Sequence, residues 1–294
     1  MKRTLFITHA FHLSLKRGQM VFRAVETGED CGSVPVEDIG IVVVENPEVL
    51  MTMPLLSALT EQNACVVFCD SKRLPSSMLC SLDANSKQGE MRIAQRKAGV
   101  SLKKGLWKQV VEAKIRNQAA LLDKLGLDGS VLKSYLDNVK SGDSGNMEGV
   151  AAKVYWDRLF GGGFSRSREG MVPNHFLNYG YTVVRAAMAR ALLGSGLSLD
   201  DGLFHRNVYN AMPLVDDLME PFRPFVDEVV YSFHQEGRKE LGSEEKQKLI
   251  GMLAERVSFK ERHCSFFDGL SVASASLGSV FLGYGKVLKF PYLE

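Results

Sequence analysis

The chain has 294 residues, a length that suggests about two domains or one large domain. Hydrophobic residues make up 45% of the chain and charged residues 24%, which is typical of a folded globular protein and argues against disorder. The 36 basic and 34 acidic side chains nearly cancel, so a surface that binds nucleic acid must be confined to one part of the chain.

The candidate targeting and anchoring segments are short. The apolar residues after Lys2 and Arg3 end too soon for the core of a secretion signal. The longest uncharged run, residues 269–285, is diluted by serine and glycine and suits a buried helix better than a membrane span. Five cysteines are widely spread, which predicts neither a disulfide framework nor a paired zinc motif. We therefore expect a cytoplasmic protein without a membrane partner.

The first part of the chain has the pattern of short β-strands. The segments with this pattern are residues 4–7, 11–15, 20–25, 39–45 and 64–70. The turn at residues 16–19 joins the second and third of them into a hairpin, and residues 54–62 are expected to form one short helix. The strand pattern stops in the serine-rich stretch 75–89, so we place a domain boundary near residue 80.

The rest of the chain has the hydrophobic period of α-helices. The expected helices are residues 105–125, 147–160, 178–193, 214–233 and 243–257, separated by clusters of Gly, Ser and Asp. The sequence therefore predicts an α+β protein with a small β-rich domain, residues 1–80, followed by a larger all-helical domain, residues 81–294.

One stretch departs from the neutral balance of the whole chain. Residues 92–118 hold eight basic residues and a single acid, Glu112, which gives a net charge of +7. On a helix beside Trp107, such a stretch can neutralise DNA phosphates without reading the bases. Lys108, Lys114 and Arg116 are the candidates for these contacts. An ordinary solvated helix face explains the stretch equally well.

Acidic residues and one histidine form a second candidate site. His205 follows a glycine-rich stretch, and Asp216, Asp217 and Glu220 lie within fifteen residues of it. Asp216 and Glu220 would repel each other on one helical face unless a cation intervened, and Pro221 indicates a break that can redirect Glu220. Carboxylates with one imidazole suit Mg²⁺ or Mn²⁺. The alternative is a solvated acidic turn beside a packed histidine.

Glu148 lies in the first turn of an expected helix, with Asn146 as its predicted N-cap. The positive end of the helix dipole alone can explain a glutamate there, because it stabilises the charge by about 0.3 to 1 kcal/mol. Its position by itself therefore demands no functional role.

Four motifs that occur in order together resemble one protein family. They are Asn146-Met147-Glu148-Gly149, Asn178-Tyr179-Gly180-Tyr181, His205-Arg206-Asn207 and the acidic segment 216–224. With residues 106–118 and the N-terminal strands, they resemble the CRISPR-associated endonuclease Cas-one, the integrase subunit of spacer acquisition, and its type II branch in particular. The resemblance covers most of the chain.

The resemblance implies a β-domain that forms a symmetric homodimer and a helical domain that holds one Mg²⁺ or Mn²⁺. Glu148, His205 and Glu220 of the helical domain would be the metal ligands and the catalytic residues, and Asp217 is the candidate for orienting one of these ligands. The implied activity is that of a prokaryotic endonuclease and integrase of antiviral defence. It would join the 3′-hydroxyl ends of protospacer DNA to the CRISPR repeat by phosphoryl transfer.

The implied partners are double-stranded protospacer and repeat DNA and a small CRISPR-associated subunit. The type II likeness adds the effector nuclease and an accessory protein that binds DNA ends as candidates. Two other functions stay open. A non-catalytic DNA-binding scaffold would explain the basic stretch but needs no Glu/His/Glu set, and it is the stronger alternative. A metal-dependent hydrolase of small phosphoesters would use the ligands but not the basic stretch.

Overall fold

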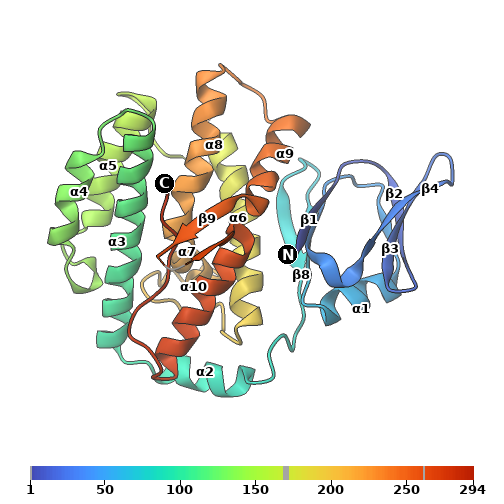
Figure 1. The fold of residues 1–294 in the computed structure, drawn as a ribbon, viewed down its shortest axis with the longest axis horizontal. Helices are drawn as coiled ribbons and strands as arrows, with labels where there is room; N and C mark the ends of the chain where they lie inside the picture. Colours follow the sequence, from blue (N-terminus) through green and yellow to red (C-terminus); the bar gives the residue numbers. More distant parts are fainter. Residues whose placement is uncertain (1, 168–171, 261) are drawn as a thin grey trace. The chain divides into compact units, whose positions relative to one another are not determined.

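The computed structural model describes residues 2–167, 172–260 and 262–294 (Figure 1). The chain divides into two compact units, Met1–Asn85 and Ser86–Glu294. The division lies a few residues after the boundary predicted near residue 80. The first unit is rich in strands and the second consists mostly of helices, so the prediction of an α+β fold is confirmed.

Two four-stranded sheets form the first unit. The first sheet has the order β1-β5-β7-β8, with β1 (Arg3–Ile7), β5 (Ile39–Val44), β7 (Cys65–Cys69) and β8 (Pro75–Leu79). The second has the order β4-β3-β2-β6, with β2 (Phe11–Lys16), β3 (Gln19–Ala24), β4 (Asp30–Pro35) and β6 (Leu50–Met51). Helix α1 (Met53–Glu61) buries Leu55 and Leu59 in a core to which both sheets contribute.

The predicted strands and the predicted hairpin are confirmed, whereas β4, β6 and β8 were not expected. All three lie at the edge of a sheet. An edge strand is held by backbone pairing with one neighbour and can remain polar on its exposed sides, so it shows no apolar pattern. β8 begins at Pro75, and the start of an edge strand is a place where proline is tolerated. β8 lies inside the serine-rich stretch 75–89, so the prediction that the strands end before it is wrong.

Strand β5 is buried along its whole length and pairs in parallel with β1 on one side and β7 on the other. From the sequence alone, so apolar a run is unsuited to an open sheet edge, which predicts that a dimer interface or the helical domain covers it. Instead of an open edge, β5 has paired neighbours on both sides, and Ile39, Val42 and Val44 lie in the core of its own unit. The run therefore gives no argument for a dimer.

The second unit is built around two long helices. Helix α6 (Asn174–Gly194) packs against α7 (Pro213–Met219), α8 (Arg223–Gln235), α9 (Ser243–Gly251) and α10 (Phe266–Phe281). Helix α3 (Val100–Lys124) packs against α4 (Ser130–Tyr135), α5 (Met147–Phe160) and α8, and α2 (Gln88–Lys97) precedes it. The uncharged run at 269–285 supplies most of α10, which is largely buried as expected. Within the described ranges, no helix combines the length and the apolar character needed to cross a membrane.

The second unit is not all-helical. The helix expected at 243–257 ends at Gly251 and is followed by a hairpin of β9 (Arg256–Phe259) and β10 (Arg262–Ser265). Strands of four residues are too short for hydrophobic period to distinguish them from helix. The helix expected at 214–233 is divided into α7 and α8, and the basic stretch is divided between α2 and α3.

Candidate active site

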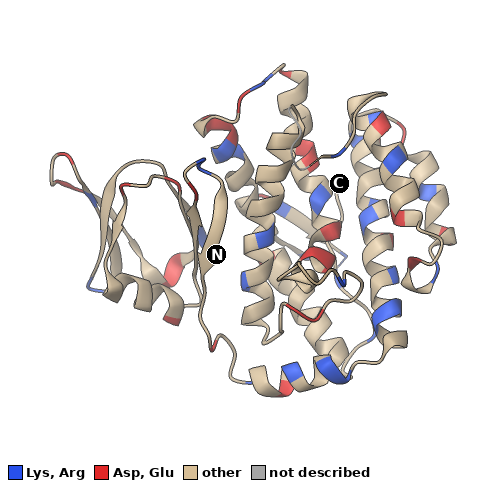
Figure 2. Ribbon diagram, turned by 180° about the vertical axis from the view of Figure 1, so that it is seen from behind, with Lys and Arg blue, Asp and Glu red and all other residues tan. Residues whose placement is uncertain are grey.

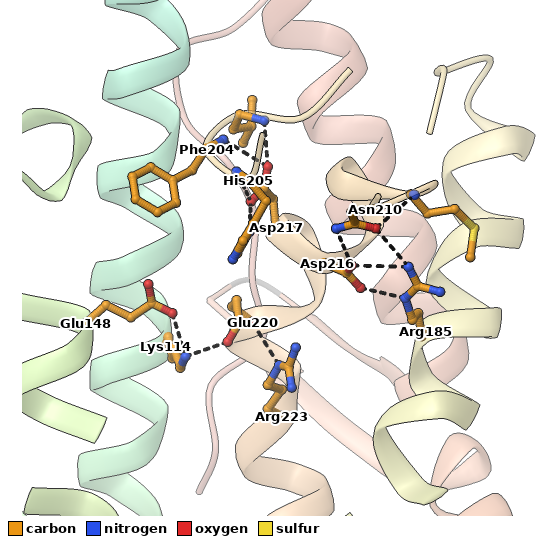
Figure 3. A network of polar contacts seen from close by, with 12 residues as sticks. Lys114, Glu148, Arg185, Phe204, His205, Asn210, Asp216, Asp217, Glu220 and Arg223 are labelled. Carbon is orange, nitrogen blue, oxygen red and sulfur yellow. Dashed lines mark hydrogen bonds and ion pairs between the residues drawn. The ribbon is translucent and has the colours of Figure 1, made fainter. Parts of the chain in front are cut away.

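Glu148, His205 and Glu220 come together in the second unit from three separate segments (Figure 3). Glu148 lies in the first turn of α5, His205 in the loop before α7, and Glu220 between α7 and α8. The three side chains point toward the same space, next to Lys114 of α3. The structure thus brings together the three residues that the sequence singled out at distant positions.

A break between two helices positions Glu220. This residue starts a 3₁₀ turn, Glu220–Phe222, between α7 and α8. The break predicted from Pro221 is confirmed, but Glu220 itself keeps helical angles, with φ −52° and ψ −44°. Such a break frees backbone carbonyls from the helical pattern. The buried Asn117 on α3 donates to the Pro221 carbonyl at 2.8 Å, which fixes the turn to α3.

Asp143, and not Asn146, caps the helix that carries Glu148. The Asp143 carboxylate accepts hydrogen bonds from the backbone N–H of Met147 at 2.8 Å and of Glu148 at 3.0 Å. Asn146 has a left-handed backbone, φ 51°, and makes no capping hydrogen bond through its side chain, so the predicted cap is wrong. In that conformation it closes a turn in which its N–H bonds to the Asp143 carbonyl. Asp143 therefore fixes the turn from which Glu148 projects.

Replacing Asp143 with alanine should lower the free energy of unfolding by about 1 to 2 kcal/mol, because two amides at the start of α5 lose their acceptor. Urea denaturation followed by circular dichroism measures this change. Asp137→Ala, at an exposed position in a preceding turn, is the matched control and should change the value by less than about 0.5 kcal/mol. Equal losses in the two variants would contradict the capping role.

Lys114 links the two glutamates. Its ammonium nitrogen lies 2.7 Å from Glu148 Oε1 and 2.5 Å from Glu220 Oε2, and Arg223 Nε lies 2.9 Å from Glu220 Oε1. Burial disfavours the charged form of Glu220, but Arg223 and Lys114 outweigh it and hold the pKa of Glu220 below its ordinary value. Burial likewise opposes the charge of Lys114, yet Glu220 and Glu148 raise its pKa. Glu220 and Lys114 are therefore charged together.

Asp217 holds His205 as the sequence position suggested. Its Oδ1 atom lies 2.5 Å from Nδ1 of His205, and the carboxylate also accepts the backbone N–H groups of Leu203, Phe204 and His205. The hydrogen bond to Asp217 raises the pKa of His205 despite partial burial, and the charges of Asp217, Glu220 and Glu148 add to this. The contact at Nδ1 leaves Nε2 facing the glutamates.

Two aromatic rings support the imidazole from the side. Phe204 stacks in parallel on Trp107 of α3 with 4.5 Å between ring centroids, and the His205 ring stands edge-on to both at 5.7 Å. Trp107 is fully buried, so it provides a fixed surface for the loop. The imidazole is thus oriented by a hydrogen bond on one edge and by packing on its side.

Asp216 does not join this group. Its carboxylate pairs with Arg185 of α6 at 2.6 Å and accepts a hydrogen bond from Asn210. The expected repulsion between Asp216 and Glu220 is removed because each carboxylate has its own cationic partner.

The residues fit a divalent ion by their chemistry. In residues 2–167, 172–260 and 262–294, no group of three or more His, Cys, Asp or Glu side chains is arranged as a metal site, and Lys114 lies between two of the candidate ligands. Two carboxylates and a neutral imidazole nitrogen are nevertheless a suitable donor set for Mg²⁺ or Mn²⁺. The position of the Lys114 ammonium shows that the space between the carboxylates accommodates a positive charge.

The three basic candidates for DNA contact lie in different surroundings, although basic residues recur along α2 and α3 (Figure 2). The Lys108 side chain is 42% exposed, and its ammonium nitrogen lies 3.5 Å from Glu112 Oε1. Lys114 is 12% exposed and is held by the glutamates, which differs from the exposed position that we expected. Arg116 donates to the Pro291 carbonyl at 3.1 Å and lies over the Tyr292 ring. Lys114 and Arg116 are thus held by contacts within the second unit, whereas the Lys108 side chain is partly exposed beside Glu112.

Comparisons of the sequence with known proteins identify one family, and comparisons of the structure show its fold. The family model described as CRISPR associated protein Cas1 matches residues 5–257. The CRISPR-associated endonuclease Cas1 of Neisseria meningitidis serogroup C is 38% identical over 98% of this chain and 95% of its own length. Among solved structures, a casposase bound to integration product has a TM-score of 0.80 at 21% identity, covering 98% of this chain and 92% of that chain. A Cas6-RT-Cas1–Cas2 complex has a TM-score of 0.74 at 16% identity, covering all of this chain and 36% of that chain.

The two structural matches establish the shared fold, and the sequence matches establish the kinship. The family model and the relative from Neisseria each span most of the chain, including the segments that carry Glu148, His205 and Glu220. The chain therefore belongs to the Cas1 family of CRISPR-associated proteins.

Proposed function

We propose that this protein is a divalent-metal-dependent DNA endonuclease and integrase of CRISPR adaptation. It joins the 3′-hydroxyl ends of protospacer DNA to the CRISPR repeat by phosphoryl transfer. The observation that carries the proposal is the convergence of Glu148, His205 and Glu220 in one place, with Asp217 on the far edge of the imidazole. Membership of a family whose curated relative is named an endonuclease supports it.

Each residue of the site has a distinct task in this proposal. Glu148, Glu220 and Nε2 of His205 would hold Mg²⁺ or Mn²⁺, which when bound polarises the scissile phosphate and offsets charge on the attacking and leaving oxygens. Asp217 keeps the proton on Nδ1 and so presents Nε2 as the donor atom. Arg223 keeps the Glu220 carboxylate charged and fixes its direction.

The partners follow from the same proposal. We propose that the chain acts on double-stranded DNA as a homodimer with a small CRISPR-associated subunit, because the same fold occurs in a solved Cas6-RT-Cas1–Cas2 complex. For the type II branch, the effector nuclease and a protein that binds DNA ends are the further candidates.

The direct test is incubation of a labelled duplex and a repeat-containing target with Mg²⁺, with Mn²⁺ and with EDTA. Joined product that depends on the divalent ion supports the proposal. Tight duplex binding without cleavage or joining under any condition would favour the alternative, a non-catalytic DNA-binding scaffold. Hydrolysis of a small phosphodiester without any effect on DNA would favour the phosphoesterase.

Among the basic residues, we propose Lys108 for contact with a DNA phosphate, because its side chain is 42% exposed whereas Lys114 and Arg116 are held by contacts within the second unit. Replacing it with alanine should lower the salt dependence of duplex binding by about 0.9 in the slope of log K against log salt concentration, since one counterion fewer is released. The effect should be similar for unrelated DNA sequences. Glu112→Ala, which removes the neighbouring acid, should not reduce the slope, and an unchanged slope for Lys108→Ala would exclude the contact.

A further inference from the structure

Lys114 contacts both of the glutamates that form the candidate active site. It projects from the middle of α3, its side chain is only 12% exposed, and its ammonium lies within 2.7 Å of an oxygen atom of each carboxylate. An ammonium buried to this degree is held there by its charged partners and not by solvent. The contact is therefore a built part of the site.

The two glutamates depend on this cation to different degrees. Glu220 is 6% exposed and also has Arg223 as a partner. Glu148 is 19% exposed, and within the described part of the chain its ion pair is with Lys114. Two poorly solvated carboxylates directed at one space repel each other unless a positive charge lies between them. Without Lys114, Glu148 in particular would face Glu220 with no positive charge between them.

A divalent ion held by the same carboxylates would need the space that the Lys114 ammonium takes. The two cations cannot share it, because an ammonium repels a divalent ion and competes for the same oxygen atoms. The four-carbon stem of lysine is flexible, so the ammonium can move aside while the helix stays in place.

We propose that Lys114 is an internal counter-cation that holds Glu148 and Glu220 together when no divalent ion is bound and leaves its place between them when the ion binds. This proposal rests on the proposed metal-dependent function. It makes two statements: the ammonium stabilises the protein without the ion, and it opposes binding of the ion.

A lysine that only supports the fold would behave differently. Its loss would lower the melting temperature by equal amounts with and without the ion, and ion affinity would stay the same or fall. Loss of a competing counter-cation lowers the melting temperature without the ion but increases the affinity for the ion, because the carboxylates become more negative and free.

The test compares Lys114→Met with Lys124→Met. Lys124 lies on the same helix but makes a more exposed ion pair with Glu228, so it is the matched control. Melting temperatures are measured in EDTA and over a Mn²⁺ titration, and Mn²⁺ binding is measured directly by electron paramagnetic resonance. For Lys114→Met we expect a lower melting temperature in EDTA, an apparent Kd for Mn²⁺ that is about fivefold lower or more, and a larger rise in melting temperature at saturation. The control should match the wild type in affinity.

An apparent Kd for Mn²⁺ that is unchanged or higher in Lys114→Met would overturn the proposal that the ion displaces the Lys114 ammonium. Lys114→Gln, which removes the charge but keeps polar contacts, gives the same measurement if the methionine variant does not fold. If the wild type binds no Mn²⁺, the proposed metal-dependent function fails, and the proposed displacement of the Lys114 ammonium fails with it. In that case the melting temperatures in EDTA still test whether Lys114 acts as a counter-cation. The double variant Lys114→Met/Glu148→Gln should lose less melting temperature than the sum of the losses of the two single variants. Additive losses would reject the counter-cation role.

Discussion

Replacing Glu148 or Glu220 with glutamine should reduce metal-dependent cleavage and joining of DNA by about a hundredfold to a thousandfold or more, the range seen when a group that stabilises transition-state charge is lost. Duplex binding should be nearly unchanged, because phosphate contacts elsewhere supply the affinity. The proposed ion acts mainly on charge that develops during the reaction, so its loss lowers the rate more than the binding.

Glutamine is the informative replacement because of what surrounds these carboxylates. Truncating Glu220 to alanine would leave Arg223 and the poorly solvated Lys114 short of a partner, and would lower stability together with activity. Glutamine keeps the size of the side chain and removes its negative charge. Melting temperature measured on each variant then separates loss of chemistry from loss of fold.

The double variant provides a second check. If Glu148 and Glu220 act through one ion, replacing both should be hardly worse than replacing either one. Glu112 is a partly exposed acid on α3, so Glu112→Gln is the control and should keep full activity. Full activity of Glu220→Gln, or activity of the wild type in EDTA, would show that the assignment is wrong.

The regular helices and the central strands could be predicted because each has a recognisable hydrophobic pattern within its own segment. Strand β5 is an unbroken apolar run, and α5 begins and ends where its hydrophobic period does. The edge strands β4 and β8 and the hairpin β9–β10 could not be predicted, because they are short and depend on pairing with neighbours. Backbone pairing between strands leaves little trace in the sequence of either partner.

The residues of the candidate site could be predicted from the sequence, but most of the contacts between them could not. Glu148, His205 and Glu220 were singled out as residues, and their grouping came from the family resemblance. Arg223 lies three residues after Glu220, a spacing that signals an ion pair on a helix, so this contact was open to detection. The link from Lys114 to both glutamates joins α3 to two other segments, and only the packed structure reveals it.

The proposed ion-binding site should also respond to pH through His205. Because Asp217 raises the pKa of His205, the imidazole takes up a proton at a higher pH than usual, and a protonated imidazole cannot bind a metal ion. Below that pKa, the apparent Mn²⁺ affinity should fall by up to about tenfold per pH unit. Replacing Asp217 with asparagine should move the fall to lower pH and reduce activity by about 10 to 100-fold.

The stability of the protein in EDTA should change in the opposite direction. A histidine whose pKa is raised by folding stabilises the fold fully below its unfolded value of about 6.5, and this contribution is lost as the pH rises through the folded value. Asp227 contributes a change of the same sign, because burial raises its pKa to about 6 while Tyr155 and Tyr181 donate to its carboxylate. The wild-type curve alone therefore cannot isolate His205.

The difference between wild type and Asp217→Asn isolates it, because Asp227 is the same in both proteins. Asparagine has one acceptor oxygen and no charge, and it therefore also loses hydrogen bonds from backbone N–H groups around Leu203. For this reason the variant should be less stable than the wild type at every pH. The gap in melting temperature should be widest below pH 6.5 and should narrow as the pH rises through the raised pKa of His205, while Mn²⁺ affinity of the wild type increases over the same interval. If the two proteins give parallel curves of melting temperature against pH, or if the Mn²⁺ affinity of the wild type does not change with pH, the Asp217–His205 pair does not couple ion binding to protonation.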